Sequence, residues 1–183
     1  MPLNNFKNQI TSEFKEIVNS ININYDYLEI EVSKNNIYSF LTILKDEYGF
    51  NMLSDLTCVD FLGEKERFEL VYNLFSLSNH IRILIKVRIS ETAPEIISST
   101  SIFQSANWFE REIFDMFGIL FTNHPNLKRL FLYEEFVGHP LRKDYKYNKR
   151  QPLTGPDKYI CSTGIDGGES FEQLKSELIK KDN

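Results

Sequence analysis

Residues 81–89 read IRILIKVRI, and this stretch decides the fold because its alternation is the clearest in the chain. Every second residue is apolar, and the residues between them are mostly charged. Side chains of a strand point alternately to the two faces of a sheet, so the pattern predicts a strand with one buried face. Residues 67–76 alternate in the same way, and residues 51–62 are apolar enough to lie centrally in a sheet. Short polar connections join the three segments and suit hairpins, so we expect an antiparallel meander.

Further elements precede this meander. Residues 27–32 place apolar side chains on one face and glutamates on the other, which predicts a fourth, half-buried strand. Apolar residues at helical spacing predict one helix near the N-terminus and a second that ends at Gly49. The sequence therefore predicts an α+β fold, in which two N-terminal helices pack on a mainly antiparallel four-stranded sheet. A motif helix and an extended C-terminal tail are expected to follow the sheet.

The division of the chain follows from a change in composition after Tyr145. Residues 1–145 carry the strong periodicity and are expected to form the α+β domain. Residues 146–183 are rich in Pro, Gly and charge, so we expect an extended tail that contacts a partner. Apolar residues within 169–181 lie at helical spacing and predict a short terminal helix there.

Composition excludes several classes of protein. The net charge of −5 argues against a nucleic-acid binder driven by overall charge. No apolar run reaches the roughly 18 residues that a membrane span needs, and the first residues resemble neither a signal peptide nor a transit peptide. We therefore expect the chain to stay in the compartment where it is made. The two cysteines, Cys58 and Cys161, cannot supply a four-thiolate cluster by themselves.

Charges alternate closely with aromatic side chains in residues 107–145. Within this segment, Asn107 can cap a helix over residues 107–117 and Gly118 can end it. Arg111 and Asp115 lie one turn apart on the same side of that helix. Two interpretations stay open: a surface helix with solvated charges, or carboxylates that meet basic residues of this chain or a partner. The candidate cations are Arg129, Arg142 and Lys143.

The charged residues of the segment admit other interpretations. Residues 139–150 hold five basic side chains against one acid, which suits docking onto an acidic protein or an anionic lipid headgroup better than RNA. Carboxylates and the two histidines, His124 and His139, contain the atoms for metal binding or acid–base chemistry. Their spacing matches no metal motif, however, and no glycine-rich phosphate loop occurs. Each histidine precedes a proline in a turn, where a hydrogen bond to the backbone is the ordinary explanation.

The segment resembles one family. Residues 110–119, EREIFDMFGI, with Phe121, His124-Pro125 and residues 127–130, LKRL, look like the signature of the C subunit (the 30-kilodalton subunit) of proton-pumping NADH:quinone oxidoreductase, respiratory complex I. Residues 138–145, GHPLRKDY, resemble its second motif, and residues 55–60 and 67–74 are weaker echoes. One departure is visible, because Lys146 stands where the family usually has proline.

The resemblance implies a non-catalytic structural subunit of the hydrophilic arm, which braces the D subunit that holds the quinone site. It implies further contacts with the B and I subunits, no cofactor on this chain, and FMN and iron–sulfur clusters elsewhere in a complex that passes electrons from NADH to quinone and translocates protons. It also implies a peripheral place on the cytoplasmic side of a bacterial inner membrane, or alternatively on the matrix side of the mitochondrial one. The expected interface and structural motif comprises Glu110, Arg111, Glu112, Asp115, Gly118, His124, Pro125, Arg129, His139, Pro140, Arg142, Lys143 and Asp144.

Two alternatives remain. A similar subunit occurs in related membrane-bound hydrogenase-type complexes, which this sequence separates poorly from complex I. The other alternative is a free-standing enzyme or RNA-binding module built on the same fold, which would need a ligand of its own.

Overall fold

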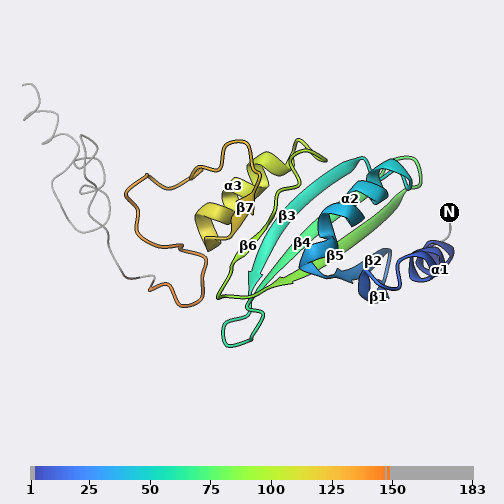
Figure 1. Cartoon of the computed structure of the whole chain (residues 1–183), viewed down its shortest axis with the longest axis horizontal. Coiled ribbons are helices and arrows are strands. Elements are labelled where there is room, and N and C mark those ends of the chain that lie inside the picture. Colours follow the sequence, from blue (N-terminus) through green and yellow to red (C-terminus); the bar gives the residue numbers. More distant parts are fainter. Residues whose placement is uncertain (1–2, 147, 149–183) are drawn as a thin grey trace, which may run out of the picture. The chain divides into compact units, whose positions relative to one another are not determined.

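The computed structural model describes residues 3–146 and residue 148. All of its helices and strands lie within one compact unit, formed by Met1–Glu134 and Gly138–Lys146 (Figure 1). In chain order they are α1 (Leu3–Glu13), β1 (Val18–Asn24), β2 (Tyr27–Val32), the 3-10 helix η1 (Lys34–Asn36), α2 (Ile37–Asp46), β3 (Met52–Asp60), β4 (Phe68–Ser76), β5 (Ile81–Ile89), β6 (Glu95–Ile97), α3 (Ala106–Phe117) and β7 (Leu120–Thr122). The expected division at residue 145 stays a prediction, and the terminal helix expected in residues 169–181 lies outside the described residues.

The predicted α+β class and the mainly antiparallel sheet are confirmed. Strands β3, β4 and β5 form the expected meander, with Leu70 opposite Cys58 on one side and Val87 on the other. The sheet order is β1-β2-β5-β4-β3, and the pair β2 and β5 is parallel. The alternating stretch that predicted the fold therefore occupies the centre of the sheet.

Two expectations about the sheet were wrong. The sheet has five strands rather than four, because β1 pairs with β2 at the opposite edge from β3. A register shift between Val18 and Ser20 interrupts the alternation of β1, which removes the sequence signal of a strand. Strand β3 lies at an edge rather than centrally. Its outward side chains Met52 and Val59 are 46% and 38% exposed, so its apolar character does not reflect burial on both faces.

The core lies against one face of the five-stranded sheet. Inward side chains of β2, β3, β4 and β5 pack with buried residues of α1, α2 and α3, including Ile10, Phe40 and Ile113. The outward face carries the charged residues of the alternating strands, where Lys86 of β5 pairs with Glu29 of β2 at 2.7 Å. A half-polar sheet with all helices on one side is the arrangement expected of a two-layer α+β fold.

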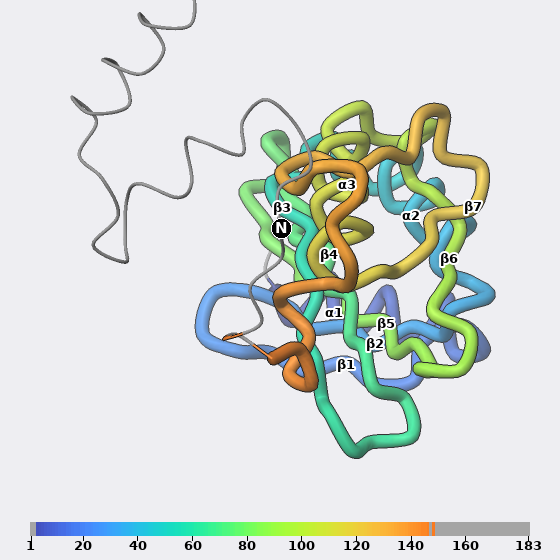
Figure 2. Tube along the Cα trace, turned by 90° about the vertical axis from the view of Figure 1, so that its left-hand side faces the viewer, coloured from blue at the N-terminus to red at the C-terminus, as the bar shows by residue number. Residues whose placement is uncertain are grey.

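Helix α3 nearly coincides with the helix predicted over residues 107–117. It ends as expected at Gly118, whose φ of 72° is left-handed. It begins at Ala106, so Asn107 lies inside the helix and the expected cap by Asn107 was wrong. Strand β7 then pairs in parallel with β6, with Phe121 opposite Ile96. In Figure 2 the loop after β7, in orange, passes over α3, and its amides at residues 130–132 bond to the helix.

Candidate functional site

Asp115 organises the loop that follows β7, which we call the motif loop (residues 123–134 and 138–146). The Asp115 side chain is fully buried, and its Oδ2 accepts hydrogen bonds from the backbone N–H groups of residues 130, 131 and 132 at 3.0, 2.8 and 3.0 Å. Its Oδ1 accepts a 2.7 Å bond from Arg129. Successive amides that converge on one anion form a nest. The nest therefore fixes the course of the loop after Arg129.

The pKa of Asp115 reflects this arrangement. Burial alone would raise it, but the bonds from the three amides and from Arg129 outweigh burial and lower the pKa below its usual range. The carboxylate is thus ionised and accepts bonds from four donors. Its role is to hold the loop.

The second motif closes the C-terminal end of α3, where helix carbonyls lack intrahelical partners. His139 donates from Nδ1 to the carbonyl of Asp115 at 2.9 Å, and the amide of Leu141 donates to the carbonyl of Met116 at 3.1 Å. Arg142 donates from Nε to the carbonyl of Phe117. Burial and neighbouring arginines lower the pKa of His139, so its ring stays neutral and serves as a cap.

Gly118 is required for this closure. A Cβ atom at this position would lie 2.4 Å from His139 Nε2 and 2.8 Å from Arg142 Nη2. The left-handed φ of 72° is a second reason for glycine, because a residue with a Cβ atom is strained in that conformation. The motif glycine therefore allows both the helix end and the approach of the second motif.

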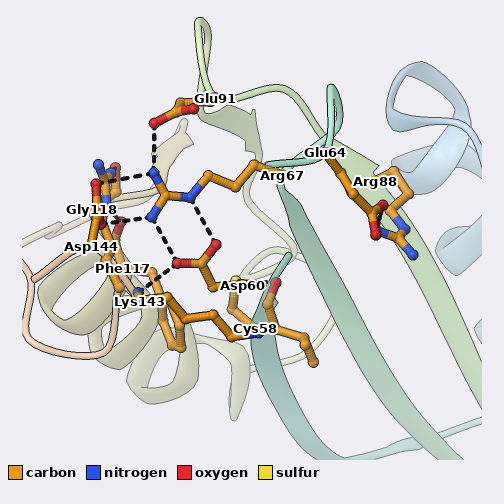
Figure 3. Close-up of polar contacts among 12 residues, drawn as sticks. Cys58, Asp60, Glu64, Arg67, Arg88, Glu91, Phe117, Gly118, Lys143 and Asp144 are labelled. Carbon is orange, nitrogen blue, oxygen red and sulfur yellow. Dashed lines mark hydrogen bonds and ion pairs between the residues drawn. The ribbon is translucent and has the colours of Figure 1, made fainter. Parts of the chain in front are cut away.

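A buried arginine ties the second motif to the sheet (Figure 3). Arg67, at the start of β4, is 1% exposed and forms two bonds with Asp60, at 2.7 and 2.8 Å. The same guanidinium donates to Asp144 at 2.7 Å and to Glu91. Asp60 also accepts the backbone N–H of Lys143 at 2.8 Å. We call Arg67, Asp60, Glu91 and Asp144 the arginine cluster.

The arginine cluster has a clear electrostatic signature. The bonds from Arg67 lower the pKa of Asp60 below its usual range, although burial opposes the shift. They lower the pKa of Asp144 in the same way. The ring of Phe68 lies 5.1 Å from the guanidinium carbon of Arg67 and 5.1 Å from that of Arg142. This aromatic contact connects the arginine cluster to the cap on α3.

Glu110 holds a different segment to α3. It is fully buried and accepts bonds from the Ser98 hydroxyl at 2.6 Å, the Ser99 amide at 2.7 Å and the Ser99 hydroxyl at 2.7 Å. Burial raises its pKa, and these bonds only partly oppose the shift. The expectation that the motif carboxylates meet cations therefore holds for Asp115 but not for Glu110.

Arg111 and Glu112 are the other charged motif residues of α3. Arg111 and Asp115 share a side of the helix by spacing but do not pair, because Asp115 turns inward to the nest. Arg111 donates instead to the carbonyls of Lys128 and Arg129, and it lies 5.0 Å from the Trp108 ring. Glu112 is exposed.

The histidines serve the backbone, as their place before proline indicated. Nδ1 of His124 accepts the amide of Asn126 at 3.0 Å, so Nε2 donates to the carbonyl of Asn107 at 3.3 Å. His124 and Pro125 thus fix the turn after β7 against the start of α3. Pro140 follows His139 at the other end of the helix. Within the described part of the chain, no group of three or more His, Cys, Asp or Glu side chains could hold a metal ion.

Sequence reasoning missed the centre of the arginine cluster. Lys143 and Asp144, which belong to the expected interface and structural motif, are bonded within this chain to Asp60 and Arg67. The available signal was Asp60, a charged residue within the apolar residues 51–62. The interface role of the motif residues stays a prediction.

The chain is similar to known proteins. The family model described as respiratory-chain NADH dehydrogenase, 30 Kd subunit, matches residues 30–151. The chain belongs to this family. A protein named as the C subunit of NADH-quinone oxidoreductase from Citrifermentans bemidjiense is 47% identical over 129 residues, which cover 70% of this chain and 76% of that protein. The expected family is therefore confirmed, and the chain is a subunit of an oxidoreductase complex.

Other members and solved structures extend the comparison. A protein named as the C/D subunit of NADH-quinone oxidoreductase from Bdellovibrio bacteriovorus is 40% identical over 68% of this chain, which spans 22% of that protein. The structure of a trypsin-resistant fragment of Nqo5 is 30% identical, with a TM-score of 0.61, and covers 69% of this chain and all of the fragment. A chain of an archaeal membrane-bound sulfane sulfur reductase covers 91% of this chain and 95% of its own length, with a TM-score of 0.72. At 22% identity it shows the shared fold alone.

Proposed function

We propose that this chain is a non-catalytic structural subunit of the hydrophilic arm of an NADH:quinone oxidoreductase. The proposal rests on where the charged side chains of the motif form their bonds. Asp115, Arg142 and Asp144 direct their polar groups to the backbone and side chains of this chain, where they fix a loop. A group that performs chemistry must instead reach a substrate. The motif thus contributes a rigid surface rather than a chemical step.

The partner that this surface braces is the D subunit, which holds the quinone site. Support comes from the relative named as a C/D subunit, in which a region similar to this chain is 22% of one longer polypeptide. A single chain keeps its two parts at high effective concentration, which suits parts that dock on each other. Contacts with the B and I subunits follow from the family resemblance, and no nucleic acid is involved.

The cofactors of the complex lie outside this chain. FMN and iron–sulfur clusters in other subunits carry electrons from NADH to quinone, and the complex couples this transfer to proton translocation. The chain binds the membrane indirectly, as a peripheral subunit on the cytoplasmic side of a bacterial inner membrane; the matrix side of the mitochondrial inner membrane is the alternative. Among residues 3–146, no helix is long and apolar enough to cross a bilayer.

A second candidate has one observation in its favour. The fold is shared with a chain of the archaeal sulfane sulfur reductase complex. A subunit with the same fold could therefore serve a related membrane-bound complex of the hydrogenase type, which has a different electron donor or acceptor.

Native purification of the tagged chain from mildly solubilised membranes tests the proposal. Mass spectrometry is expected to identify flavin, iron–sulfur, quinone-site and membrane subunits, together with NADH:quinone activity. Recovery of hydrogenase or sulfur reductase subunits would move the chain to the second candidate. Recovery of a lone monomer would overturn both.

A further inference from the structure

The motif loop presents two large apolar side chains to solvent. Phe131 is 65% exposed and Leu141 is 53% exposed, although the backbone of each is held firmly. Single exposed apolar residues are common on protein surfaces. These two differ because the folding of the loop uses their amides, whereas their side chains point outward. Their side chains are therefore free of any role in fixing the loop and are open to solvent.

Both residues are fixed to the same end of α3. The amide of Phe131 donates to Asp115 Oδ2 at 2.8 Å, and the amide of Leu141 donates to the carbonyl of Met116 at 3.1 Å. Asp115 and Met116 are consecutive in the helix. Because the backbone is already ordered, binding through these side chains would cost little further conformational entropy.

Basic residues accompany the two apolar side chains. Lys128 precedes Phe131 in the loop, and Lys143 and Lys146 follow Leu141; all three lysines are exposed. The nearby carboxylates Asp60 and Asp144 are already bonded to Arg67 and so do not neutralise these lysines directly. Glu134 is the one further acid of the motif loop and is exposed, so the loop keeps a surplus of exposed cations. An apolar centre with charged residues at its rim is the usual composition of a protein–protein interface.

From these observations we propose that Phe131 and Leu141 are the apolar anchors of the docking surface, and that the partner is a protein subunit with an apolar pocket and an acidic rim. This inference rests on the proposed function and specifies the contact by which the subunit is held. An aromatic anchor favours a protein pocket. A lipid headgroup or a nucleic acid would be bound mainly through the lysines, and the chain as a whole carries a net charge of −5.

The first test compares two double variants of the full-length tagged chain in cells that lack the untagged copy. Phe131→Ser with Leu141→Ser removes the anchors. Tyr25→Ser with Leu77→Ser is the matched control, since these residues are 101% and 61% exposed in the β1–β2 and β4–β5 turns. The anchor variant is expected to recover the quinone-site subunit about tenfold less or worse, as for interface hot spots. The control is expected to match the wild type, and both variants are expected to melt at the wild-type temperature.

A second measurement does not depend on the folding of a variant. A photo-reactive phenylalanine analogue at position 131 is expected to cross-link to the quinone-site subunit in intact membranes. Cross-links confined to lipid or nucleic acid would overturn the proposal.

Charge reversal separates the remaining outcomes. Lys128→Glu with Lys143→Glu is expected to reduce recovery several-fold, less than the anchor variant does. If charge reversal abolishes recovery while the anchor variant recovers the quinone-site subunit normally, docking is electrostatic and the proposal is wrong. If the wild-type chain recovers no oxidoreductase subunit at all, the proposed function fails, and this inference fails with it.

Discussion

At the scale of single residues, helix α3 carries two buried carboxylates with opposite electrostatics. Asp115 receives bonds from a cation and three amides, so its pKa falls. Glu110 receives bonds from one amide and two hydroxyls, and burial raises its pKa. Both side chains are withdrawn from solvent, but Glu110 lies deeper in the protein, so burial raises its pKa more. The cation Arg129 and the larger number of converging amides lower the pKa of Asp115 further.

Asp115→Asn is expected to lower the free energy of unfolding by about 3 kcal/mol. Hydrogen bonds to a charged group are lost, and the new amide N–H₂ then faces either Arg129 or the three backbone donors. Glu112→Gln is the matched control, three residues away on the exposed side of α3, and is expected to change stability by less than about 0.5 kcal/mol. Urea unfolding of both purified full-length variants measures the difference. Equal losses in the two variants would show that the nest does not hold the loop.

The arginine cluster predicts how stability depends on pH. Asp60 and Asp144 have lowered pKa values in the folded chain, so the unfolded state binds protons more readily as the pH falls. Their contribution to stability is present above the unfolded value of about 3.9 and is lost as the pH falls through the folded values. Glu110, with its raised pKa, acts in the opposite direction.

Asp60→Asn is expected to be less stable than the wild type by about 3–5 kcal/mol at pH 7, since Asp60 is the buried counter-charge of Arg67, whereas Glu91 and Asp144 are about half exposed. The variant is also expected to lose less further stability than the wild type when the pH is lowered from 5 to 3. Urea unfolding at a series of pH values measures both effects. An acid limb of unchanged slope would show that Asp60 titrates as it does in the unfolded chain.

At the scale of elements, the end of α3 is where the helix, the motif loop and the sheet are joined. Gly118 ends the helix, and His139 and Arg142 bind its last carbonyls. The neighbouring Asp144 binds Arg67, which directly precedes β4. A substitution at Gly118 is therefore expected to affect α3, the motif loop and the sheet.

Gly118→Ala tests that junction against Gly63→Ala. Both glycines have left-handed φ values, 72° and 99°, but a Cβ atom at Gly63 meets nothing within 4 Å. The strain common to both variants is expected to cost about 1 kcal/mol. Gly118→Ala is expected to cost about 1–2 kcal/mol more, because His139 must move and its bond to the helix is lost. Thermal unfolding compares the two; equal costs would show that the second motif does not depend on the close approach.

At the scale of the whole molecule, the helices, strands and buried clusters all lie before residue 147 in the part of the chain that the structure describes. We therefore expect a core that folds without the C-terminal residues.

Deletion of residues 146–183 is expected to leave the core folded, with a cooperative thermal transition, but to prevent assembly with the partner subunits. Circular dichroism of the truncated chain checks folding, and native purification from membranes checks assembly. Normal incorporation of the truncated chain into the complex would contradict the expected role of the tail.

Local pattern was enough to predict much of this protein. Alternation predicted β2, β4 and β5, helical spacing predicted α2 and α3, and Gly118 marked the helix end, because these features depend on neighbours within a few residues. The motif residues also identified the family. The same logic explains the missed β1, whose register shift breaks the local period.

Only the tertiary structure decided which charges meet. Arg67 and Asp144 are 77 residues apart in sequence, and Asp60 joins them from the end of β3. No spacing rule relates such positions, and several cations were available to each carboxylate. Burial determines which of these charges pair, because a carboxylate withdrawn from water is stable only where donors converge on it. The chain thus specifies its elements locally, and the packing of the motif loop on α3 and the sheet determines its ion pairs.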